Sequence, residues 1–197
     1  MLVNKTVTDL IDAFAAPTPT PGGGSAAALT GAVAAALLEM VASMPKTRTG
    51  TPEERAALDA VLPNLRALRA SLTALVDRDS ASYDAVVAAY KLPKATDAEK
   101  AARKTAVRDA MRGATDVPLE TARSAAHLVA HGRAVAANGN PNARTDAAVA
   151  VNMARTAVFG AIQNVEINLD SVGDDAYAAT VRSEIESLRI AVSNFEL

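Results

Sequence analysis

The residue at position 79 is an aspartate that falls on an apolar helical face. Leucines from Leu65 to Leu75 recur at spacings of three and four, and Asp79 occupies the next position of the same face. This spacing is typical of the buried side of a helix. A buried carboxylate costs free energy unless it is hydrogen-bonded or paired, and burial raises its pKa. Asp79 is therefore a candidate general base, the alternative being a structural hydrogen bond or ion pair, whereas Asp77 and Arg78 are expected to face solvent.

A proline- and glycine-rich segment, Pro17-Thr-Pro-Thr-Pro-Gly-Gly-Gly-Ser25, precedes a long alanine-rich run. Alternate prolines hold the backbone extended, and Ser25 is expected to cap the helix that follows. The backbone of Gly22, Gly23 and Gly24 would then be open to a ligand, and a helix N-terminus favours an anion. The segment is predicted to bind an anionic group of a ligand, and a flexible linker is the alternative.

Two further pairs of side chains could bind a ligand. Asn164 and Asn168 share one helical face among apolar residues, where amides need hydrogen-bond partners. His127 and His131 are four residues apart on one helix face, a spacing that can hold a metal. No third ligand lies near them in the sequence and the chain has no cysteine, so they are predicted to be surface or interface residues and no metal site is expected.

The composition points to an all-α protein. Half of the 197 residues are hydrophobic, yet there are three Phe, three Tyr and no Trp, so the core must be built from Ala, Val and Leu. With 20 basic and 22 acidic residues and few aromatics, nucleic acid is not expected as a partner. The N-terminus lacks the layout of a signal peptide, and the apolar run from Ala26 to Leu38 is too short to span a bilayer. We expect no membrane partner and a cytoplasmic location.

Capping signals and prolines divide the chain into the elements that must position these residues. Helices are expected over residues 6–15, 25–44, 52–91 with a kink at Pro63, 96–112, 118–137, about 145–169 and 174–197. The asparagine-rich stretch between 138 and 142 is predicted to be a turn. Six or seven helices with short connections favour a single domain over residues 1–197, folded as an antiparallel helical bundle.

Several short motifs occur in an order that resembles one family along nearly the whole chain. They are Ala16–Ala28 with its glycines, Leu75-Val-Asp-Arg-Asp79, Leu92-Pro-Lys94 with Glu99-Lys100, Val117-Pro-Leu119, Gly139-Asn140 with Thr145-Asp146, and Phe159-Gly160 with Asn164-Val165 and Asn168. The set resembles the cyclodeaminase/cyclohydrolase family of one-carbon folate enzymes. The family includes formiminotetrahydrofolate cyclodeaminase and a free-standing methenyltetrahydrofolate cyclohydrolase.

The resemblance implies an all-helical homodimer without a metal or redox cofactor. Asp79 matches the catalytic aspartate of the family, and the substrate-binding residues expected with it are Gly22, Gly23, Gly24, Ser25, Lys94, Asn142, Asp146 and Asn164. Lys94 is a candidate for the glutamate tail of a folate. The dimer is expected to be joined through helix faces, and the small residues Gly31, Ala34 and Ala35 would allow close contact at the centre of the fold.

The expected activity is hydrolysis of methenyltetrahydrofolate to formyltetrahydrofolate, because the stretch from Leu92 to Leu119 looks closest to the cyclohydrolases. Formiminotetrahydrofolate cyclodeaminase is the alternative, since the same aspartate could serve both reactions. An inactive folate-binding protein is a further alternative. It is suggested by Pro45–Gly50, which departs from the Thr-x-Gly-Lys-like stretch of the family. Glu39 and Glu166 also stand where the family has other residues.

Overall fold

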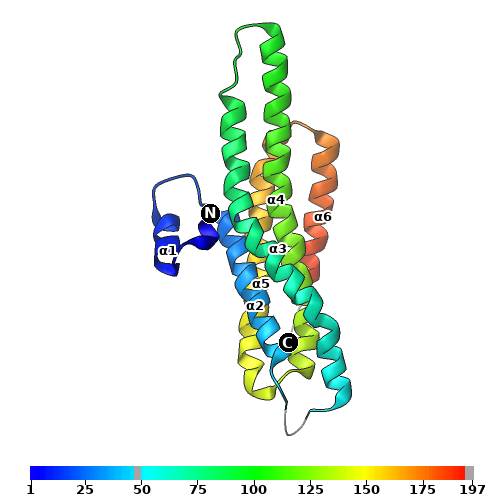
Figure 1. Cartoon of the computed structure of the whole chain (residues 1–197). Helices are drawn as coiled ribbons and strands as arrows, with labels where there is room; N and C mark the ends of the chain where they lie inside the picture. The colour runs from blue at the N-terminus through cyan, green and yellow to red at the C-terminus, as the bar shows by residue number, and fades with distance from the viewer. Residues whose placement is uncertain (47–49, 194–197) are drawn as a thin grey trace.

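The computed structural model describes residues 1–46 and 50–193, and within them the chain is all-α, which confirms the predicted fold class. Short 3-10 turns lie at Leu2–Asn4 (η1) and Pro141–Ala143 (η2). The α-helices are α1 (Val7–Ala15), α2 (Gly23–Ser43), α3 (Pro52–Tyr90), α4 (Asp97–Asn138), α5 (Arg144–Val172) and α6 (Asp175–Ser193) (Figure 1).

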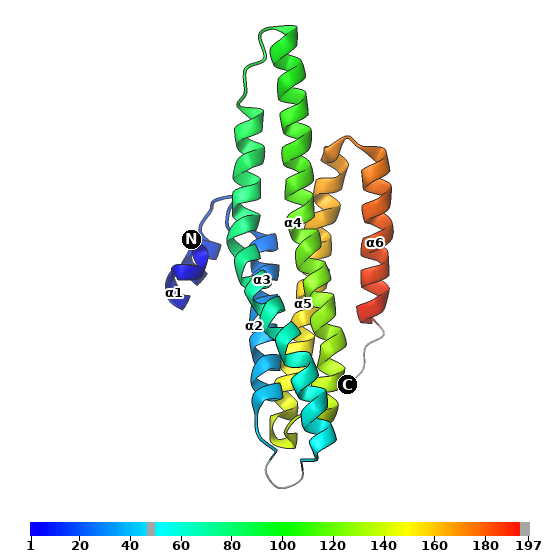
Figure 2. The same cartoon turned by 45° about the vertical axis from the view of Figure 1, so that its right-hand side comes forward.

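Four long helices form the bundle. Helices α2, α3, α4 and α5 pack as successive neighbours, with α2 also touching α5, so the four close into a ring. They run alternately up and down, and the α3–α4 hairpin projects beyond the other helices (Figure 1). Helix α6 packs against α4 and α5, whereas α1 lies apart from the bundle (Figure 2). Among the described residues, α6 covers the face formed by α4 and α5, and no further helix packs on the face between α2 and α5.

Helix α4 corrects the predicted boundaries. The sequence favoured two helices over 96–112 and 118–137, but α4 runs unbroken from Asp97 to Asn138 with Pro118 inside it. A proline removes one backbone hydrogen bond and disfavours a helix interior. Here Pro118 is buried between Val117 and Leu119, so tertiary packing outweighs the local preference. Capping boxes are present at Thr51 and Thr96, at the starts of α3 and α4.

Small residues of α2 are used inside the bundle. Ala34 and Ala35 are fully buried, and Gly31 lies against Leu72 of α3 and Ala157 of α5. They allow the helices to pack closely at the centre of the bundle. The shorter run Ala26–Leu38 expected from the sequence underestimated the apolar length of helix α2, which is the one helix of the described residues that is long and apolar enough to cross a membrane. More than half of that stretch (56%) is buried inside the bundle, as in the core helix of a soluble protein.

Candidate functional site

Asp79 lies half-buried on α3, against the first turn of α2. The Ser25 hydroxyl donates a hydrogen bond to Asp79 Oδ2 at 2.9 Å, and Ser25 Oγ is 3.1 Å from Ser80 Oγ. Ser25 is completely buried. It is not the helix cap that the sequence suggested, because α2 begins at Gly23 with Gly22 as its N-cap. Ser25 instead points across to α3 and binds the carboxylate.

The glycines of α2 make room for that carboxylate. A Cβ atom built on Gly24 would overlap the Asp79 side chain, lying 2.6 Å from Cγ and 2.8 Å from Oδ2. A Cβ on Gly23 would be 3.1 Å from Asn164 Nδ2. The N-cap Gly22 has no side chain to cap the helix. Asp79 therefore places a negative charge beside this helix N-terminus, whose dipole favours an anion.

Two opposing effects set the pKa of Asp79. Burial raises the pKa of its carboxyl group, because the charged form loses solvation. Hydrogen bonds from the Ser25 side chain and backbone favour the charged form and act in the opposite direction. Burial is the larger effect, so the pKa lies above the ordinary aspartate value. A carboxylate with a raised pKa is suited to accept a proton from a reacting group.

A cavity of about 270 Å³ opens beside Asp79. It is lined by residues from the proline–glycine segment and from α2, α3, α4 and α5, and these are Pro19, Thr20, Gly22, Gly23, Gly24, Asp79, Ser82, Tyr83, Val86, Met111, Ala114, Asn164 and Asn168. Among these described residues Asp79 is the one charged side chain. The cavity is thus formed where four helices meet, and it presents a single negative charge.

Two amides lie on the cavity wall, and each is held by a backbone carbonyl. Asn164 Nδ2 donates to Gly160 O of its own helix at 2.8 Å, and Asn168 Nδ2 donates to Ala114 O of α4 at 2.8 Å. These bonds satisfy one N–H of each amide and fix its orientation. The remaining capacity of each amide is available to a molecule in the cavity.

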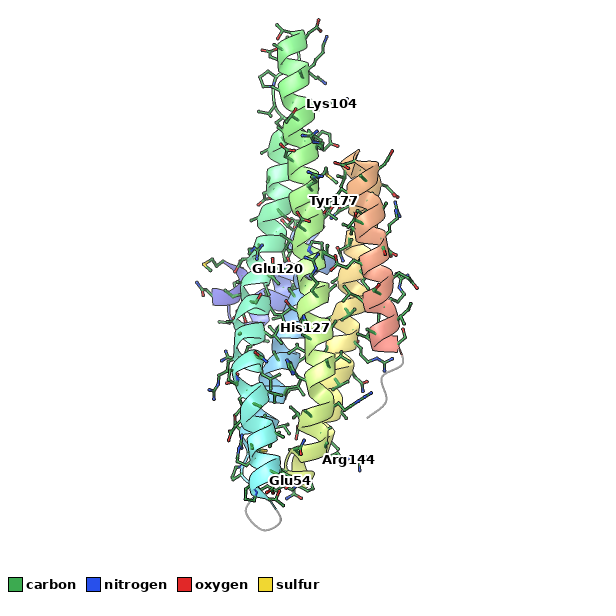
Figure 3. The ribbon with its side chains drawn as sticks, turned by 90° about the vertical axis from the view of Figure 1, so that its right-hand side faces the viewer. Glu54, Lys104, Glu120, His127, Arg144 and Tyr177 are labelled. Atoms are coloured by element: carbon green, nitrogen blue, oxygen red, sulfur yellow. The ribbon has the colours of Figure 1, made fainter. Side chains whose placement is uncertain are left out.

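The structure brings five of the expected site residues to this cavity, namely Gly22, Gly23, Gly24, Asp79 and Asn164. Ser25 lies behind the wall, bonded to Asp79. Three others lie elsewhere in the protomer. Lys94 lines a separate basic cavity with Lys100, Arg103 and Lys104, near the tip of the α3–α4 hairpin. Asn142 and Asp146 belong to η2 and the first turn of α5. Figure 3 shows how far apart these regions are, with Lys104 near one end and Arg144 near the other.

Some lining residues were not singled out from the sequence. Ser82, Tyr83 and Val86 follow Asp79 at spacings of three, four and seven, so they share its helix face. This spacing is the sequence signal that could have identified them as neighbours of Asp79 in the cavity. Met111 comes from α4, and nothing in its local sequence distinguishes it.

Two further charged residues considered in the sequence analysis, Asp77 and Glu39, form specific contacts in the structure. Asp77 does not simply face solvent, because it is half-buried and accepts hydrogen bonds from the backbone N–H groups of Leu2 and Val3. It holds the N-terminal turn against α3. Glu39, a departure from the family pattern, forms ion pairs with Arg66 at 3.0 Å and Arg69 at 2.8 Å.

The remaining expectations concern the histidines and an altered loop. His127 is exposed and His131 is half-buried, and burial lowers the pKa of His131. No group of three metal-ligating side chains occurs in the described part of the chain. The altered loop predicted at Pro45–Gly50 includes residues 47–49, which lie outside the described residues.

Comparison with known proteins gives three consistent results. The family described as formiminotransferase-cyclodeaminase matches residues 6–187. A methenyltetrahydrofolate cyclohydrolase from Methylorubrum extorquens is 40% identical over 95% of this chain and 90% of its own length. A formimidoyltransferase-cyclodeaminase from Sus scrofa is 38% identical over 95% of this chain but only 35% of its own length.

A solved structure also matches the fold. The crystal structure of formiminotetrahydrofolate cyclodeaminase from Thermotoga maritima superposes with a TM-score of 0.85 at 24% identity, covering 98% of this chain and 92% of that one. The fold is therefore shared with that protein. The family resemblance predicted from the motifs is confirmed by the sequence matches.

Proposed function

The chain belongs to the formiminotransferase-cyclodeaminase family, and we propose that it hydrolyses methenyltetrahydrofolate to formyltetrahydrofolate in the cavity beside Asp79. The relative named as a methenyltetrahydrofolate cyclohydrolase matches this chain over almost the whole of both proteins. The chain spans only about a third of the bifunctional relatives, with 35% of the Sus scrofa protein covered. The relative named as a cyclohydrolase thus consists almost entirely of this one helical unit, whereas the bifunctional relatives are about three times as long.

The observation that carries the proposal is the charge of the cavity. Methenyltetrahydrofolate bears a positive charge that is shared over an amidinium group, in which one carbon bridges two folate nitrogens. Asp79 is the one charged side chain among the described lining residues, and it is negative. A half-buried carboxylate attracts this cation more strongly than it would in water, because the surrounding protein screens the interaction less. The site therefore combines electrostatic attraction for the substrate with a proton acceptor.

The hydrolysis follows from these groups. A water oxygen forms a bond to the bridging carbon, and its proton passes to Asp79. The positive charge is neutralised as the tetrahedral adduct forms. One carbon–nitrogen bond then breaks, and the leaving nitrogen takes a proton from Asp79. The formyl group remains on the other nitrogen, and the second hydroxyl proton goes to solvent. Asp79 acts first as general base and then as general acid, and no metal or redox cofactor is needed.

Cyclodeamination of formiminotetrahydrofolate is the second candidate, because relatives with that name share the same helical unit. In that reaction a folate nitrogen attacks the carbon of the protonated formimino group, and Asp79 takes the proton of the attacking nitrogen. Asp79 then returns this proton to the amino group of the adduct, whose carbon–nitrogen bond breaks as ammonia leaves. The product is the methenyl compound. An inactive folate-binding protein is disfavoured by the intact pair of Asp79 and Ser25.

A homodimer in the cytoplasm is also proposed, with the open face between α2 and α5 as the contact surface. The exposed residues of α2 are uncharged and include Val33 and Met40. The exposed residues of α5 between Val149 and Ile167 are also uncharged. Long, uncharged, partly apolar surfaces are typical of protein contacts. A second copy of this chain would cover this face, which α6 leaves open.

The test of the function uses the purified protein with each substrate in turn. Loss of the methenyl absorbance measures hydrolysis, and release of ammonia from formiminotetrahydrofolate measures cyclodeamination. We expect hydrolysis well above the rate without protein. Ammonia release without methenyl hydrolysis would support the second candidate, and neither reaction would contradict both.

A further inference from the structure

Ser25 occupies an unusual place for a residue expected to bind substrate. Its side chain is completely buried, and it is not among the residues that line the cavity. The glycine before it, Gly24, does line the cavity. A substrate in the cavity would therefore meet the backbone of Gly24 and the Asp79 carboxylate, with the Ser25 hydroxyl behind them. The contact of Ser25 with the substrate must be indirect.

The hydroxyl of Ser25 has one hydrogen, and the geometry assigns it. Ser25 Oγ donates to Asp79 Oδ2 at 2.9 Å, so it cannot also donate to Ser80 Oγ at 3.1 Å. Ser80 must then be the donor in that contact. The result is a chain of hydroxyls that runs from Ser80 through Ser25 to the carboxylate. Each hydrogen bond fixes the orientation of the next hydroxyl, and the last one is donated to the Asp79 carboxylate.

We propose that Ser25 is a positioning residue for Asp79, holding its carboxylate at the cavity edge and favouring the charged form that accepts the proton. Three observations carry this proposal, namely the bond to Oδ2, the complete burial of Ser25 and its absence from the cavity wall. Among the described side chains, Ser25 is the one that donates to this carboxylate. The described residues that line the cavity include no basic side chain to do so in its place. The proposal rests on the proposed function for its kinetic consequences only.

Ser25→Ala tests the proposal, with Thr121→Val as the matched control. Thr121 is also buried, but its hydroxyl donates to the Val117 carbonyl of its own helix. Loss of a hydrogen bond to the charged form raises the pKa of Asp79. We therefore expect the acid limb of the kcat/KM profile to move to higher pH in Ser25→Ala. On that limb, the rate should fall by about tenfold, as expected for losing a hydrogen bond to a charged group. Thr121→Val should leave the limb in place.

A measurement independent of turnover separates this proposal from the proposed function. The titration of the Asp79 carboxyl carbon, followed by NMR in the wild-type protein and in both variants, reports its pKa directly. An upward shift in Ser25→Ala alone supports the proposal, even if neither folate is turned over. An unchanged titration in a folded Ser25→Ala protein overturns it, even if the wild-type protein is an active cyclohydrolase.

A folding defect would not prevent the test. If Ser25→Ala does not fold, Ser25→Cys replaces it, because a thiol has similar size and is a weaker donor. The titration of Asp79 should again move upward, by less than in the alanine variant. An unchanged titration in the cysteine variant would overturn the proposal in the same way.

Discussion

The Asp79 carboxylate of α3 rests directly on the backbone of Gly24 in the first turn of α2. A side chain at Gly24 would overlap it, since a Cβ there would lie 2.6 Å from Asp79 Cγ. This contact explains why a glycine run and a distant aspartate belong to one site. The glycine allows the approach, the helix N-terminus favours the negative charge, and the neighbouring Ser25 supplies a hydrogen bond.

Gly24→Ala should therefore displace the carboxylate. We expect kcat for methenyltetrahydrofolate to fall by roughly 10²-fold or more, because a misplaced general base loses much of its effect. Gly113→Ala is the matched control, since a Cβ on Gly113 of α4 meets no atom within 4 Å. That variant should retain wild-type kcat and gain about 0.5–1 kcal/mol of stability. Equal activities of the two variants would contradict the role of the contact.

Asp79→Asn should remove the proton acceptor and keep the shape of the site. The expected loss in kcat is roughly 10²–10⁴-fold, the usual contribution of a general base. Asp77→Asn is the control, because Asp77 contacts the N-terminal turn and does not line the cavity. Steady-state kinetics that place the larger loss at position 77 would show that the base has been assigned to the wrong carboxylate.

The same substitution should affect stability in a pH-dependent way. Burial raises the pKa of Asp79, so the charged form is disfavoured in the folded protein. The resulting cost is absent below the ordinary aspartate pKa of about 3.9 and grows as the pH rises through the raised value. Asp79→Asn should therefore have a melting temperature at least as high as wild type at pH 7, and this advantage should shrink on acidification. A variant that is destabilised at pH 7 would indicate that the carboxylate stabilises the fold.

The pH profile of activity should show a single acid limb from Asp79. Because burial raises the pKa of this carboxyl group, kcat/KM should begin to fall at a higher pH than an exposed aspartate would give. The profile of methenyl hydrolysis, corrected for the reaction without protein, measures this limb. A constant kcat/KM down to the ordinary aspartate range would argue against Asp79 as the base.

Val33→Asp should dissociate the proposed dimer. Val33 is 42% exposed on α2, one of the two helices of the proposed contact face, and a charge there would lose its solvation at a contact between copies. Light scattering at micromolar concentration should give about twice 20.2 kDa for the wild-type protein and 20.2 kDa for the variant. Ile190→Asp is the control, because Ile190 is exposed on α6, away from that face. A wild-type monomer would contradict the proposal.

Local signals in the sequence were enough for the fold class and for choosing Asp79 as the candidate base. The composition and the three-and-four spacing of leucines predicted helices. Capping signals predicted where they begin, because the start of a helix depends on nearby residues. The break predicted before Pro118 was wrong, because the free energy of burying its neighbours comes from other helices. Asp79 could be identified because a carboxylate on an apolar face is anomalous within its own helix.

The partners of Asp79 were decided by the tertiary structure. Ser25 is 54 residues away in the sequence, and its change from a predicted cap to a donor depends on how α2 packs against α3. Lys94, Asn142 and Asp146 share motifs with the family, but motifs carry no distances, and the long helices place these residues outside the cavity of one protomer. Sequence alone determined which side chains could do chemistry, because that depends on their type and local spacing. Only the packing of the helices decided which of them meet, because contacts between distant segments depend on the whole bundle.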